Sequence, residues 1–179
     1  MDVCAPKIAV LGLGNLLFKD EGLGVVAMHY LRHNFRFSAA LDFVDGGTLG
    51  INLLDYFHDY SHLLILDSLS TPSAEPGAVF RLPLTALQNL GDYRKTAHEI
   101  ELLQALDMAR LLGLNFELEV VAMIPQDIES VTFVLSEPVQ AAMPLMADTA
   151  REVLANWGVQ THPIAQPLSA AKIAAHHHP

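Results

Sequence analysis

The chain has 179 residues, 51% of them hydrophobic and 17% charged, which suits one ordinary folded domain and excludes a disordered chain. Twenty acidic residues against ten basic ones give a formal net charge of −10. This charge argues against binding to nucleic acid or to an anionic membrane surface, because both require a positive face. We expect a single α/β domain over 1–161, followed by a loose tail over 162–179.

The cellular compartment is suggested by cysteine content and by the apolar runs. A single cysteine, Cys4, permits no intrachain disulfide, which fits a reducing compartment. The first residues lack the charged-then-apolar layout of a signal peptide, and no apolar run approaches the ~20 residues of a membrane span. We therefore expect a cytoplasmic protein with no membrane partner.

The first half of the chain alternates short apolar runs with segments of helical periodicity. The apolar run at 7–11 enters a glycine-containing loop, which predicts a buried strand. Asp20 and Glu21 precede a helical pattern over 22–35, and acidic residues in a first turn suit the positive end of a helix. Next come an expected strand at 41–44, a short helix at 51–57 and a strand at 62–66.

The second half completes an α/β pattern. Only about ten residues separate the strand at 62–66 from the next strand, at 78–82, too few for the crossover that joins parallel neighbours. The strand at 78–82 is therefore expected to run antiparallel. A helix over 97–112, a strand over 117–122 and a helix over 138–157 follow. Together these elements predict a three-layer α/β/α sandwich around a five-stranded, mostly parallel twisted sheet with one antiparallel strand.

Three polar side chains fall where the carboxyl ends of parallel strands meet. Glu21 follows the first strand, Asp67 ends the strand at 62–66, and His98 opens the long helix at 97–112. Open α/β sheets bind ligands at that edge, where the strand order reverses. If the first and third strands are neighbours, two carboxylates and an imidazole converge there and suit a cation such as Ni²⁺ or Zn²⁺. Each residue also has an ordinary explanation, as a helix-dipole acid, a loop cap and a helix-start residue respectively.

Two glycine-containing loops offer further candidate sites. The Gly12–Gly14 loop follows the first strand, as in nucleotide-binding folds, but Leu17 stands where the dinucleotide fingerprint requires a third glycine. The helix also begins late, so its N-terminus would not lie over a pyrophosphate. The turn formed by residues 45–48, Asp-Gly-Gly-Thr, allows another chain to approach closely. Its Asp45 is equally explained by hydrogen bonding within the turn.

The order of these motifs resembles that of the [NiFe]-hydrogenase maturation endopeptidases. The resemblance extends from the first strand to about Trp157 and is most specific where GLGNLLFKDEGLGV is followed by DGGT. It rests on the segment Gly12–Val25, the turn Asp45–Thr48, the strand Leu63–Asp67 and the helix start Ala97-His98.

The resemblance implies both a fold and an activity. The fold is a three-layer α/β/α sandwich whose five-stranded sheet contains one antiparallel strand. The activity is that of an aspartyl-type or metal-dependent endopeptidase, which removes a C-terminal extension from the [NiFe]-hydrogenase large-subunit precursor after nickel insertion. The nickel is expected to be the precursor's own, and Zn²⁺ or Cd²⁺ is expected to be able to substitute for it.

The resemblance also assigns residues. By motif, the family's metal-binding residues fall on Glu21, Asp67 and His98, and its functional aspartate falls on Asp45, which we expect to be catalytic. Contacts to the substrate are expected from Gly46, Gly47 and Thr48. Two other functions stay open at this point: a nucleotide- or phosphate-binding module that uses the Gly12–Gly14 loop, and a docking chaperone that binds the precursor without cutting it.

Overall fold

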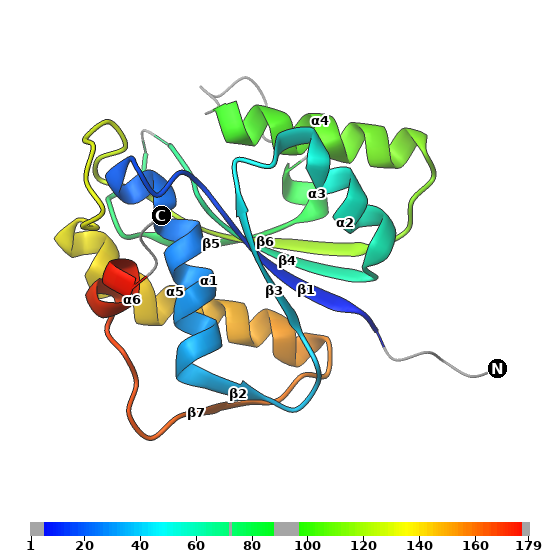
Figure 1. The fold of residues 1–179 in the computed structure, drawn as a ribbon. Coiled ribbons are helices and arrows are strands. Elements are labelled where there is room, and N and C mark those ends of the chain that lie inside the picture. The colour runs from blue at the N-terminus through cyan, green and yellow to red at the C-terminus, as the bar shows by residue number, and fades with distance from the viewer. Residues whose placement is uncertain (1–5, 72, 88–96, 177–179) are drawn as a thin grey trace.

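One five-stranded sheet forms the centre of the molecule. The computed structural model describes residues 6–71, 73–87 and 97–176. The strand order is β3–β1–β4–β6–β5 (Figure 1). Strands β1, β3, β4 and β6 run parallel, and β5 pairs with β6 in the antiparallel direction, as the sequence predicts. The strands are β1 (Ile8–Leu13), β3 (Asp42–Gly47), β4 (His62–Ser68), β5 (Val79–Pro83) and β6 (Glu117–Met123).

Helices cover both faces of the sheet and complete the expected three layers (Figure 1). One face carries α1 (Leu23–Asn34), α5 (Glu137–Asn156) and α6 (Ala170–His176). The other carries α2 (Leu53–Asp59), α3 (Leu84–Leu87) and α4 (Ala97–Leu111).

Strand alternation explains why two separate hydrophobic clusters form. In β1 every side chain is buried, with Ile8 and Val10 packed in the α1 and α5 layer and Ala9 and Leu11 packed in the α2 and α4 layer. Parallel strands that are covered on both faces are apolar throughout for this reason. Within the described residues, no helix has both the length and the apolar character that crossing a membrane requires.

The segment after residue 160 differs from the expected loose tail. Strand β7 (Thr161–Pro163) pairs antiparallel with β2 (Phe35–Phe37), and α6 buries three of its side chains in the core beside α1. Between them, the Asn34 amide donates to the Leu168 carbonyl at 2.9 Å and accepts from the Leu168 N–H at 2.7 Å. The expectation was wrong as far as His176, because the partners that hold this segment lie over a hundred residues earlier in the chain.

Candidate active site

The strand order reverses beside β1, which in open α/β sheets marks the crevice where ligands bind. Strand β1 lies between β3 and β4 and is parallel to both. The chain passes from β1 to β3 on one side and then returns to β4 on the other, so the order reverses between β1 and β4. Ligands of open α/β sheets bind beyond the carboxyl ends of the strands at such a point. The condition set by the sequence, that the first and third predicted strands are neighbours, is therefore met.

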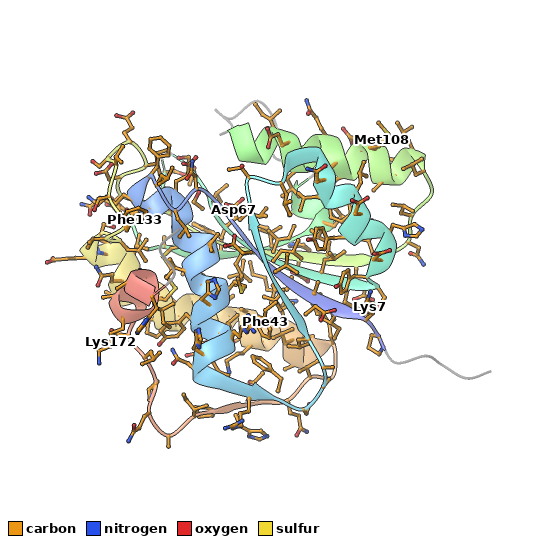
Figure 2. The ribbon with its side chains drawn as sticks, viewed as in Figure 1. Lys7, Phe43, Asp67, Met108, Phe133 and Lys172 are labelled. Carbon is orange, nitrogen blue, oxygen red and sulfur yellow. The ribbon has the colours of Figure 1, made fainter. Side chains whose placement is uncertain are left out.

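Asp67 lies at the carboxyl end of β4, next to this crevice. Its neighbours Leu63 and Ile65 pack in the α2 and α4 layer, so strand alternation places Asp67 on the same face. The residue is only 4% exposed, and its Oδ1 accepts a hydrogen bond from the Ser68 N–H at 2.7 Å. Figure 2 shows Asp67 near the ends of the central strands, between the two helical layers.

Glu21 is carried by a short 3₁₀ helix, η1 (Lys19–Gly22), between β1 and α1. The η1 segment contacts β4, the strand that carries Asp67. The Glu21 N–H donates to the Phe18 carbonyl at 2.8 Å, and the Glu21 carbonyl packs so closely on Gly14 that no Cβ would fit there. Glycine at position 14 therefore lets η1 lie directly on the loop that follows β1.

Asp45 lies on the other side of β1. In the sheet, Gly12 pairs with Asp45 of β3 and with Leu66 of β4, so the two aspartates flank the end of β1. Asp45 is exposed, and its Oδ1 accepts a hydrogen bond from the Gly47 N–H at 3.0 Å. The expected turn hydrogen bond is thus present, and the catalytic role of Asp45 stays a prediction.

The other members of the expected substrate-contacting turn follow Asp45 at the same edge of the sheet. Gly46 is buried and Gly47 is half-buried. Thr48 is exposed. The turn therefore presents one polar side chain to solvent, and its contact with substrate stays a prediction.

The backbone of His98 lies in the first turn of α4, while its side chain is outside the described residues. One turn later, the Glu101 carboxylate lies beside Gly50 in η2 (Gly50–Asn52), the segment that closely follows the Asp45 turn. The start of α4 is thus close to the segment after β3. No group of three His, Cys, Asp or Glu residues suited to a metal is found among the described side chains, which do not include His98. The metal trio stays a prediction.

A second acidic residue of the same motif has a role that local sequence reasoning missed. Asp20 is 0% exposed, and its carboxylate accepts three backbone hydrogen bonds. Oδ1 accepts from the Ser136 N–H at 2.7 Å, and Oδ2 accepts from the N–H groups of Gln126 and Asp127 at 3.0 and 3.1 Å. From the sequence, Asp20 and Glu21 are equivalent acids at a helix start, and no local signal separates them.

The loop after β6 is itself ordered by Asp127. The Lys19 ammonium donates to Asp127 Oδ2 at 3.0 Å, and the hydroxyl and N–H of Ser130 donate to the same carboxylate. Hydrogen bonds from Ser130, then from Lys19 and the Glu129 N–H, hold the pKa of Asp127 well below its usual range. The loop therefore meets η1 through an ion pair as well as through Asp20.

The geometry disfavours a nucleotide site at the Gly12–Gly14 loop. Helix α1 begins only at Leu23, and η1 fills the space between the loop and the helix. A phosphate-binding loop instead leads directly into a helix whose first N–H groups face the ligand. Here two acidic residues, Asp20 and Glu21, lie between the loop and the helix, and they would repel a phosphate.

Comparisons with known proteins identify the family. A model of the HycI hydrogenase maturation proteases matches residues 25–153, more than half of the chain. The chain is 31% identical over 169 residues to the hydrogenase expression/formation protein HupD of Rhizobium leguminosarum bv. viciae, covering 93% of this chain and 82% of that protein. It is 30% identical over 124 residues to the hydrogenase 2 maturation protease of Escherichia coli K12, covering 69% and 76%.

Comparison of the fold with solved structures identifies the same group of proteins. The structure superposes on the hydrogenase maturating endopeptidase HybD from Escherichia coli with a TM-score of 0.80 and 27% sequence identity, over 88% of this chain and 97% of that one. The resemblance inferred from the sequence motifs is confirmed. The chain belongs to the hydrogenase maturation protease family, a family of peptide hydrolases.

Proposed function

We propose that this protease removes the C-terminal extension of a [NiFe]-hydrogenase large-subunit precursor after nickel has been inserted, and that it recognises the nickel through Glu21, Asp67 and His98. The observation that carries the proposal is the meeting of the Glu21 and Asp67 segments at the β1/β4 crevice. Because the chain belongs to a maturation protease family, that crevice is the natural place for the substrate.

The donor set fits a divalent cation of this kind. Glu21 and Asp67 offer carboxylate oxygens, and His98 would add an imidazole nitrogen, a combination suited to Ni²⁺ and also to Zn²⁺ or Cd²⁺. Three ligands leave coordination positions open for groups of the precursor. A precursor without nickel would bring no charge to offset two neighbouring carboxylates, so the site would distinguish loaded from empty precursor.

The chain's own residues then orient the reaction. The nickel supplied with the substrate would polarise the scissile carbonyl or lower the pKa of a bound water. Asp45 would orient that water or hold the incoming peptide from the β3 side of the crevice. Gly46, Gly47 and Thr48 would contact the peptide backbone. We propose the cytoplasm as the location of this step, in keeping with a chain that has a single cysteine.

Incubation with two forms of the precursor tests the proposal. Nickel-loaded precursor should lose a C-terminal peptide, detected as a mobility shift of the large subunit and by the mass of the released fragment. Nickel-free precursor should stay uncut, because it brings no cation to bind between Glu21, Asp67 and His98. Equal cleavage of both forms would remove nickel recognition while leaving the protease activity in place.

The two alternative functions give different outcomes. A docking chaperone would bind the loaded precursor and leave its length unchanged. A nucleotide-binding module would be stabilised against heat by NAD or ATP, whereas the proposed protease would be stabilised by Ni²⁺, Zn²⁺ or Cd²⁺.

A further inference from the structure

A buried carboxylate that the proposed chemistry does not use lies one residue before Glu21. Asp20 has no exposed surface, and it accepts hydrogen bonds from Gln126, Asp127 and Ser136. These partners belong to the loop after β6 and to the residue that precedes α5. Hydrogen bonds to a charged acceptor are about twice as strong as neutral ones, so the three bonds hold η1 firmly against the loop after β6 and the start of α5.

The backbone of η1 adds further bonds in the same place. The Lys19 N–H donates to the Thr132 carbonyl at 2.9 Å, and the Asp20 N–H donates to the Asp127 carbonyl at 3.1 Å. On the opposite side, the Glu21 carbonyl packs on Gly14. The backbone that carries Glu21 is therefore fixed between the loop after β1 and the loop after β6.

From this geometry we propose that Asp20 is a positioning residue that holds Glu21 at the crevice. The inference rests on the proposed metal role of Glu21. Residues that orient metal ligands without touching the metal change metal affinity or activity by about ten- to hundredfold when they are replaced. An aspartate suits this position because all three partners are N–H donors, and only a carboxylate offers acceptors on both oxygens.

Asp20→Asn is the most direct test. The amide keeps the shape of the carboxylate, but its NH₂ group replaces one acceptor oxygen and then faces a backbone N–H that is also a donor. We expect this variant to bind Cd²⁺ about ten- to hundredfold more weakly in calorimetry and to process nickel-loaded precursor more slowly by a similar factor. If Asp20 acts through Glu21, the same change made in a Glu21→Gln background should have little further effect on either quantity. Every protein carries alanine at the tail histidines, so that they do not bind the metal: His176, His177 and His178.

Asp127→Asn is a milder second variant, for use if Asp20→Asn fails to fold. It weakens the ion pair with Lys19 and the hydrogen bonds from Ser130 that order the loop carrying two of the N–H donors to Asp20. The Asp127 side chain is partly exposed, so the change leaves the buried core intact. A several-fold loss of Cd²⁺ affinity is expected.

Asn34→Ala provides the matched control for stability. It removes a buried side chain that holds the Leu168 backbone at the far end of α1. This variant should melt at a lower temperature and yet bind Cd²⁺ as the wild type does. If Asp20→Asn and Asp127→Asn behave like Asn34→Ala, with lower melting temperatures and unchanged Cd²⁺ affinity and processing, the positioning role is excluded.

The outcomes also separate this inference from the proposed function. A wild-type protein that neither binds Cd²⁺ nor processes the precursor would overturn the proposed function itself. If the wild type binds Cd²⁺ and processes the precursor, and Asp20→Asn has the same Cd²⁺ affinity and processing rate at a temperature where both proteins are folded, only the role of Asp20 is overturned. Multiplicative effects of Asp20→Asn and Glu21→Gln would show that the two residues act independently, which also contradicts the proposal.

Discussion

Replacing His98 by alanine, or Glu21 by glutamine, is expected to slow processing of nickel-loaded precursor by at least about a hundredfold. Each change removes a donor atom from the proposed set, and direct ligands should cost at least as much as the groups that orient them. The rate is followed by the mobility shift of the large subunit at fixed protein and precursor concentrations. Circular dichroism at the assay temperature establishes that each variant is folded.

Two chemically matched changes serve as controls. Glu152→Gln in α5 and His162→Ala in β7 alter the same residue types at exposed positions outside the proposed site, and both should process precursor at the wild-type rate. Full processing by both His98→Ala and Glu21→Gln would remove the metal trio from the mechanism.

Gly24→Val is expected to destabilise the fold by about 3 kcal/mol, the upper end of the usual range for overpacking, because a clash with backbone cannot be relieved by rotating a side chain. A Cβ at Gly24 would overlap the carbonyl oxygens of Leu66 in β4 and Leu13 in β1. The start of α1 thus rests directly on the strand ends that border the crevice, and a side chain there would push the helix off them. Urea unfolding measures the change in the free energy of unfolding.

Ala155→Val adds a similar volume at an exposed position of α5. It should cost less than about 0.7 kcal/mol, the usual limit of helix propensity differences for such residues. A Gly24→Val variant no less stable than Ala155→Val would mean that α1 does not contact the strand ends in solution.

The sheet and its main helices could be predicted from the sequence because local patterns determine them. Strand β1 is apolar at every position since both of its faces are covered. The antiparallel direction of β5 follows from the short connection after β4, a matter of chain length alone. The pairing of β1 with β4, which brings the Glu21 and Asp67 segments together, is common in α/β topology but is only a condition at the level of the sequence, and the structure meets it.

The remaining features depend on contacts between distant parts of the chain. Asp20 and Glu21 are adjacent acids, and only the return of the loop after β6, more than a hundred residues later, buries the first and leaves the second half-buried at the crevice. The same reason explains the tail. The Asn34 side chain hydrogen-bonds the Leu168 backbone, 134 residues later in the chain. The short, alanine-rich helix α6 follows, and its seven residues are too few to give a helical periodicity that the sequence alone would reveal.

Anomalous diffraction from crystals of this protein grown with Ni²⁺ tests the central claim most directly. One ion should be found at the β1/β4 crevice, with oxygens of Glu21 and Asp67 and a nitrogen of His98 each about 2.0–2.2 Å away, as for similar ions in such ligand sets. An ion bound only elsewhere, with these three side chains directed apart and too distant for a single cation to bridge, would contradict the proposed nickel recognition.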